Sequence, residues 1–190
     1  VPVESPDAEL AMMMYSMWRE GNHCGWDRIS PYEDREPYMG WYTEGSTEVA
    51  DWDNKWMAEH GIDFMHVCWY CPYGNQVAPI KKMRVSHSAL NDGYMNAKYS
   101  DLVDFCIMWE NNGQDVKSFE QFKEFIWPYW KEYYFSDERY ARLDNKAVLT
   151  VWNKDKMKAA FGGTNEGCAE AVKFMEDELK AMGYDGLILL

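Results

Sequence analysis

The sequence lacks any run of about 18 apolar residues, the length that a helix needs to cross a membrane, so we expect no transmembrane helix. Positive charge is also scarce, because 19 Lys and Arg stand against 32 Asp and Glu, which gives a net charge of −13. Nucleic acids and anionic membranes are bound through concentrated Lys and Arg. The charge balance therefore argues against nucleic acid and anionic membranes as partners, and the missing apolar run argues against membrane insertion.

Cysteine is sparse as well, with five residues in a chain of 190, too few for a disulfide-stapled fold. Cys68 and Cys71 form a single C-W-Y-C motif, whereas a structural zinc site needs a second such pair. A redox-active CxxC normally opens a helix, where the helix dipole favours the thiolate. This motif instead ends an apolar stretch and precedes Pro72. We therefore expect ordinary thiols, with no metal site and no cofactor.

Aromatic residues, in contrast, are abundant: 10 Trp, 13 Tyr and 8 Phe make up 16% of the chain. Together with a hydrophobic content of 47%, this excludes an intrinsically disordered protein. Aromatic faces combined with acidic groups are typical of sugar-binding surfaces, although composition alone does not establish one.

Short apolar stretches alternate with helical patterns along the chain. The apolar stretches are nearly continuous, which is typical of strands buried on both faces of a parallel sheet. The predicted strands cover residues 11–18, 63–70, 104–110, 147–153 and 186–190. Helical spacing and capping signals predict helices over residues 47–60, 86–97, 118–135 and 164–182. This order predicts an α/β fold with right-handed crossovers and a parallel sheet.

Two architectures accommodate five parallel strands. A doubly wound open sheet would be complete at this length, but the first strand–helix turn, at 19–23, is neither G-x-G-x-x-G nor a P-loop. A (β/α)8 TIM-type barrel takes about 250 residues or more, so a barrel would be truncated here. We favour the truncated barrel, because the chain ends on the apolar stretch 186–190. Residues 1–190 are then the N-terminal part of one (β/α)8 domain, with about five βα units.

A tryptophan stands at or next to the end of each of the first four predicted strands: Trp18, Trp69, Trp109 and Trp152. In parallel α/β folds the C-terminal strand ends build the ligand site. Sugar rings pack their C–H faces on aromatic rings, while their hydroxyls need fixed donors and acceptors. Further candidates for substrate contact are His23, Tyr70, Glu110, Asn111 and Asn153. The structural alternative is that the four indoles fill the core or cover the open end of the barrel.

Five stretches share their order and residue pattern with the motifs of a known family. They are MYSMW at 14–18, MGWY at 39–42 with EVADWD at 48–53, EHGIDF at 59–64 with WY at 69–70, FCIMWEN at 105–111, and DNKAVL at 144–149 after Tyr133, Phe135 and Tyr140. Together they resemble the glycoside hydrolase family 99-like group of bacterial (β/α)8 proteins. That group includes endo-acting α-mannosidases and relatives linked to polysaccharide biosynthesis.

The resemblance implies a glycoside hydrolase-like protein that acts on a polysaccharide or glycan. It also implies that the catalytic carboxylates lie in an NEWxEG-like motif late in the barrel, beyond residue 190, and come from the remainder of the barrel or a second fragment. Glycoside hydrolysis needs two carboxyl groups about 5–10 Å apart. Glu110 is the best local carboxylate, more suited to lining the site than to acid or base catalysis. A glycan-directed role favours a secreted, periplasmic or cell-surface location.

Two alternatives stay open at this point: a non-catalytic glycan-binding or structural barrel domain, and a complete doubly wound module that binds a small ligand. We expect Asp51 and Asp53, in the first predicted helix, to be solvated surface residues. We also expect the unpaired strand edges of a truncated barrel to make the chain associate.

Overall fold

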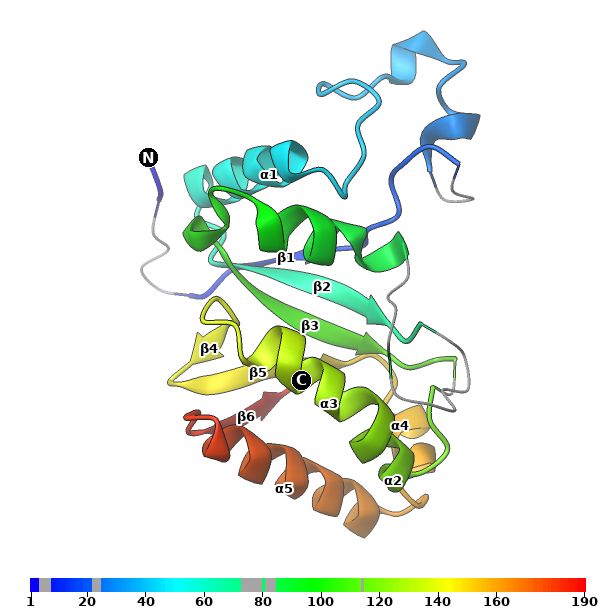
Figure 1. The fold of residues 1–190 in the computed structure, drawn as a ribbon, viewed down its shortest axis with the longest axis vertical. Coiled ribbons are helices and arrows are strands. Elements are labelled where there is room, and N and C mark those ends of the chain that lie inside the picture. The colour runs from blue at the N-terminus through cyan, green and yellow to red at the C-terminus, as the bar shows by residue number, and fades with distance from the viewer. Residues whose placement is uncertain (4–7, 22–24, 73–79, 81–84, 114) are drawn as a thin grey trace. The chain divides into compact units, whose positions relative to one another are not determined.

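The computed structural model describes residues 1–3, 8–21, 25–72, 80, 85–113 and 115–190. It is a mixed α/β structure whose parallel strands follow the order β1-β2-β3-β5-β6, with a short antiparallel strand, β4, beside β5 (Figure 1). The prediction of an α/β fold with a parallel sheet is therefore confirmed. The closed eight-stranded barrel stays a prediction.

The strands are β1 (Ala11–Met14), β2 (Phe64–Tyr70), β3 (Asp104–Glu110), β4 (Arg142–Leu143), β5 (Lys146–Val151) and β6 (Gly186–Leu189). Four of the predicted strands match these bounds closely. The first prediction, 11–18, was too long, because β1 ends at Met14. Ser16, two residues after the strand end, is buried, and its side chain contacts a segment outside the sheet. Its Oγ accepts the Ala89 amide at 3.1 Å.

The helices are α1 (Thr47–Glu59), α2 (Phe119–Gln121), α3 (Trp127–Trp130), α4 (Lys154–Ala160) and α5 (Asn165–Ala181). Helices α2 and α3 are parts of one helical stretch that also contains the π-helical segments Phe122–Ile126 and Lys131–Phe135. Pro128 lies at the start of α3, and the missing N–H of proline accounts for a local departure from α geometry there. Pro128 thus coincides with a change in helix type.

The weak helix predicted over 86–97, with its break at Asn91, Asp92 and Gly93, is helical in the structure but is not a regular α-helix. The chain instead forms three short turns, Val85–His87, Ala89–Gly93 and Tyr94–Asn96, of 3-10 and π geometry. Gly93 explains part of this, because a Cβ at that position would lie 2.8 Å from the carbonyl oxygen of Glu44. The backbone at Gly93 packs closely against the backbone at Glu44. This contact determines the conformation of the segment more strongly than its weak helical pattern does.

A tight hairpin joins β4 to β5 and was not predicted. Its two turn residues, Asp144 and Asn145, have φ values of 49° and 56°. These left-handed conformations suit a two-residue hairpin, and Asp and Asn tolerate them best after glycine. The side chain of Asn145 also donates to the carbonyl oxygen of Gly183 at 3.2 Å, which ties the turn to the segment before β6.

The chain divides into two compact units. The first contains Val1–Val67 and Arg84–Asp104, and the second contains Cys68–Met83 and Phe105–Leu190. In the first unit β1 and β2 pair in parallel, with Ala11 opposite Phe64, and α1 buries Val49, Ala50 and Met57. The second unit holds β3, β5 and β6, the hairpin strand β4 and helices α2 to α5.

The core of the second unit is aromatic. Trp130 is fully buried, and its ring packs edge-on against Trp69 at 5.1 Å, Phe122 at 5.5 Å and Trp109 at 5.6 Å between centroids. Edge-to-face contacts of this kind stabilise a core beyond the burial of their area alone. Much of the chain's aromatic content therefore serves packing.

Candidate functional site

In the second unit, three side chains meet the edge of the sheet where the parallel strands end. Tyr70 ends β2, Glu110 ends β3, and Trp152 directly follows β5. Because Trp109 lies opposite Val151 in the parallel pairing of β3 with β5, Glu110 and Trp152 leave the sheet at the same edge. Tyr70 and Glu110 are half-buried, whereas Trp152 is 55% exposed. This edge therefore combines an open indole with a carboxylate.

Asn111 joins the loop that follows β3 to the loop that follows β5. Its side-chain Nδ2 donates to the carbonyl oxygen of Asn153 at 2.9 Å, and its Oδ1 accepts the Asn153 amide at 2.9 Å. The Trp152 amide also donates to the carbonyl oxygen of Trp109 at 3.0 Å. Asn111 is buried in this arrangement. Its observed role is to position the residues that follow β3 and β5, and the sugar contact predicted for it finds no support in its placement.

Asn153 is similarly engaged. Its Oδ1 caps α4 by accepting the amides of Asp155 and Lys156, and its Nδ2 donates to Oδ1 of Asn112 at 2.8 Å. Asn112 is exposed, and the sequence analysis did not single it out. The pair of adjacent amides at 111 and 112 is the signal that could have identified it. The exposed amide of Asn112 is a better placed polar contact than Asn111.

Trp69 and Trp109 lie in the core. The Nε1 of Trp69 donates to the Tyr134 hydroxyl at 3.2 Å, and the Nε1 of Trp109 donates to Oδ2 of Asp115 at 2.7 Å. Both indoles are almost completely shielded from solvent. As they lie here, neither offers a ring face to a ligand, and both indoles fill the core. Of the three strand-end tryptophans predicted in this unit to pack against a sugar, Trp152 alone is open to solvent, and all three are described residues.

Glu110 lies near the thiol of Cys68. Burial raises the pKa of Cys68, and the negative charge of Glu110 raises it further. Cys68, Cys71 and Cys106 are buried and unbridged, and burial raises the pKa of Cys106 to about 12. The thiols of Cys68 and Cys106 are therefore kept in their unreactive neutral form.

In the first unit, Trp18 belongs to an aromatic cluster after β1. Its half-buried ring lies 6.5 Å from Trp41 and 6.2 Å from Tyr42, and Trp26 lies 5.8 Å from Trp41. The backbone amide of Trp18 donates to Oε2 of Glu44 at 2.8 Å, and the Glu44 amide donates to the Trp18 carbonyl at 3.1 Å. His23 lies outside the described residues.

Glu44 and Asp53 are two acidic groups with raised pKa values. Burial raises the pKa of Glu44 to about 7, and the nearby charge of Asp53 contributes to the increase. Burial alone raises the pKa of Asp53 to about 6. Both residues line a small hollow together with Asn54, a buried residue whose Nδ2 has no hydrogen-bond partner among the described residues.

The expectation that Asp53 is a solvated surface residue was therefore wrong. Asp53 lies four residues after Val49 and four before Met57, both of which are buried, so it shares the inward face of α1. This register was visible in the sequence. Asp51 is also only partly exposed, and its Oδ1 accepts the Tyr99 amide at 2.8 Å.

Within the described ranges, no group of three or more His, Cys, Asp or Glu side chains could hold a metal ion. None of the helices formed by these residues is both long enough and apolar enough to cross a membrane. Comparison of the chain with protein families, with curated proteins and with solved structures gave no match.

Proposed function

We propose that this chain binds a neutral carbohydrate at the strand ends of its second unit, as part of a glycoside hydrolase-like (β/α)8 protein. The observation that carries the proposal is the exposed indole of Trp152 beside the half-buried carboxylate of Glu110. An exposed indole offers its face to the C–H surface of a sugar ring. Glu110 and the Asn112 amide supply hydrogen-bonding groups for the hydroxyls.

The charge of the site and of the chain favours a neutral ligand. Glu110 is acidic, and the net charge of the whole chain is −13. A polyanionic polysaccharide would be repelled by both. The rigid mutual bonding of Asn111 and Asn153 holds the loops that carry Trp152 and Asn112, so the site is largely formed before the ligand arrives.

The hydrolase part of the proposal rests on the family resemblance, in which the catalytic carboxylate pair belongs to a later segment of the barrel. Cleavage of a glycosidic bond needs two carboxyl groups that flank it. Asp115, the other acid just after β3, is buried and accepts the indole N–H of Trp109, so it is committed to the core. This observation favours the non-catalytic alternative, a glycan-binding domain, for these residues on their own.

Isothermal titration calorimetry with neutral α-linked manno-oligosaccharides tests the binding proposal. We expect Trp152→Ala to weaken binding about tenfold, because loss of a stacked indole removes about 1.4 kcal/mol of binding free energy. Tyr133→Ala is the matched control, because Tyr133 is also exposed and belongs to the same unit but lies on a helix. Equal losses in the two variants, or no binding by the unmodified chain, would overturn the proposal.

Glu110→Gln and an assay for released reducing ends separate the two versions of the proposal. Binding without hydrolysis supports the non-catalytic domain. Hydrolysis that is lost in Glu110→Gln while binding persists assigns the acid or base role to Glu110 itself.

A further inference from the structure

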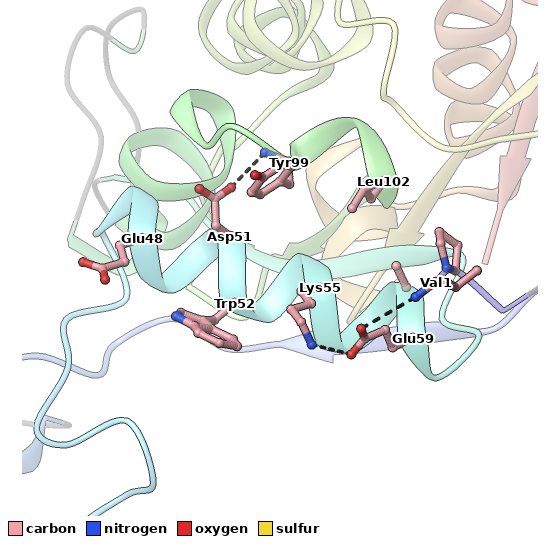
Figure 2. A pocket seen from close by; sticks show the side chains of 10 residues that line it. Val1, Glu48, Asp51, Trp52, Lys55, Glu59, Tyr99 and Leu102 are labelled. Carbon is pink, nitrogen blue, oxygen red and sulfur yellow. Dashed lines mark hydrogen bonds and ion pairs between the residues drawn. The ribbon is translucent and has the colours of Figure 1, made fainter.

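A groove lies beside α1 in the first unit. Figure 2 shows it between the helix and the segment that carries Tyr99 and Leu102. Its cavity volume is about 430 Å³, within the range of roughly 300–1,000 Å³ that is typical of small-molecule sites. Helix α1 contributes Glu48, Trp52 and Lys55 to its lining.

The groove gathers large apolar side chains that the core does not use. Trp52 is 44% exposed, Tyr99 45% and Leu102 43%. Helix α1 buries Val49 and Met57, whereas Trp52 lies at the side of that inward face and is open to solvent. Exposed apolar residues scattered singly need no explanation, but three around one hollow indicate a binding surface.

The acidic groups of the groove are unequally neutralised. Oε2 of Glu59 pairs with the Nζ of Lys55 at 2.6 Å, and its Oε1 lies 3.8 Å from the amino group of Val1. Asp51 accepts the Tyr99 amide at 2.8 Å, and its charge also interacts with the ammonium group of Lys98. Glu48 forms no ion pair with any residue in the described ranges. Glu48, one turn of α1 before Trp52, is therefore the acid of the groove that keeps its charge without a cationic partner in the described part of the chain.

The aromatic rings at this place already attract ammonium groups of the chain itself. The Nζ of Lys55 lies 5.6 Å from the centroid of the Trp52 ring, and the Nζ of Lys98 lies 4.8 Å from that of Tyr99. Such cation–π contacts form where the electron-rich face of a ring is accessible. A cation supplied by a ligand would compete with these two lysines for the same ring faces.

We infer that this groove binds an amphipathic organic cation, with the cationic nitrogen near Trp52 and Glu48 and the apolar body along Leu102 and Ala58. The unpaired carboxylate of Glu48 complements the charge, and the apolar lining complements the body. A sugar would leave most of its hydroxyls without partners against this lining. The inference is independent of the carbohydrate site, which belongs to the other unit.

Calorimetric titration with benzyltrimethylammonium, compared with the uncharged 3-phenylpropan-1-ol, tests the inference directly. We expect the cation to bind about tenfold more tightly than the alcohol, and this preference to shrink as salt screens the carboxylates. Equal affinities for the two probes, or no binding of the cation at about 10 mM, would overturn the inference.

Three substitutions identify the groups responsible. Trp52→Ala and Glu48→Gln should each weaken cation binding several-fold, and Glu48→Gln should leave the alcohol unaffected. Lys55→Met should strengthen cation binding, because it removes the internal ammonium that competes for the Trp52 ring while keeping the apolar stem. Tyr32→Ala, an exposed aromatic of the same unit, is the control and should change nothing.

Circular dichroism of each variant distinguishes loss of the site from loss of the fold. Trp152→Ala should leave cation binding intact, so failure of the carbohydrate proposal does not decide this one. Weaker cation binding in Lys55→Met, or unchanged binding in both Trp52→Ala and Glu48→Gln, contradicts the inference.

Discussion

Glu44 shows at the residue scale how burial sets the behaviour of an acid. Its carboxylate accepts the amide of Trp18, while burial and the charge of Asp53 oppose its ionisation. The folded state therefore holds a proton that the unfolded chain has released at the same pH. Asp53 behaves in the same way because it too is withdrawn from water.

These raised pKa values predict a loss of stability as the pH rises. The pKa of Glu44 changes from 4.5 to about 7 on folding, and that of Asp53 from 3.8 to about 6. Across this window the folded state binds more protons than the unfolded state, so the free energy of unfolding falls with increasing pH. We expect a fall of about 1–2 kcal/mol between pH 4 and pH 8, because both groups keep some contact with water.

Urea denaturation at several pH values measures this slope. Glu44→Gln should flatten it, because the amide carries no ionisable proton and can still accept the Trp18 amide. Glu33→Gln, an exposed glutamate of the same unit, should leave the slope in place. A slope unchanged in Glu44→Gln would show that the carboxyl does not hold its proton on folding.

The Trp109–Asp115 hydrogen bond gives a second prediction for a single residue. Asp115→Ala leaves the buried indole N–H of Trp109 without its 2.7 Å acceptor, and we expect a loss of about 1–3 kcal/mol in the free energy of unfolding. Asp115→Asn keeps an acceptor oxygen and should cost less. Urea denaturation measures both, and equal costs would mean that the hydrogen bond itself contributes little.

The contrast between Trp109 and Trp152 marks how far the site could be predicted from sequence. Each indole lies at the end of a parallel strand, and the local pattern is the same for both. Trp109 is buried because Phe122 and Trp130, from the following helical stretch, pack against its ring. Such contacts between distant segments leave no trace in the spacing along one strand. The positions of the strand ends were predictable from the sequence. It was not predictable which of their side chains stay exposed to solvent.

At the scale of elements, capping explains why some helices were predicted almost residue by residue. Helix α5 starts after Thr164, whose Oγ1 accepts the Gly167 amide at 3.0 Å. The helical stretch from α2 starts after Ser118, whose Oγ accepts the Gln121 amide, while Gln121 in turn accepts the Lys117 amide. Local side-chain to backbone bonds of this kind are visible in sequence. The turns around Gly93 depend instead on contact with the distant backbone at Glu44, and this contact is not visible in the sequence.

Thr164→Ala should destabilise the second unit by about 1 kcal/mol, the usual cost of a lost N-cap. Thr164→Ser keeps the hydroxyl and serves as the matched control. Thermal denaturation followed by circular dichroism at 222 nm measures both variants. If Thr164→Ser loses as much as Thr164→Ala, the effect comes from the methyl group of Thr164 and not from the cap.

At the scale of the whole molecule, the order of the sheet places β1 at an edge. Met12 and Met13 point to opposite faces of this strand, and they are 37% and 55% exposed. Neither face of β1 is therefore fully covered, and its outer backbone groups have no strand partner among the described residues. An exposed apolar edge strand is a template for pairing with another chain, whereas the net charge of −13 opposes association.

We expect the edge to prevail at moderate salt, so that the chain forms dimers or larger species that dissociate on dilution. Met13→Lys should shift the population towards monomer, because a lysine on an edge strand disfavours pairing. Size-exclusion chromatography with multi-angle light scattering measures the mass at several protein concentrations. Tyr133→Lys adds the same charge on a helix of the other unit and should leave the mass distribution unchanged. Because salt screens the repulsion between acidic chains, association should also increase with ionic strength. A monomer of constant mass at every concentration and salt would show that the β1 edge does not pair.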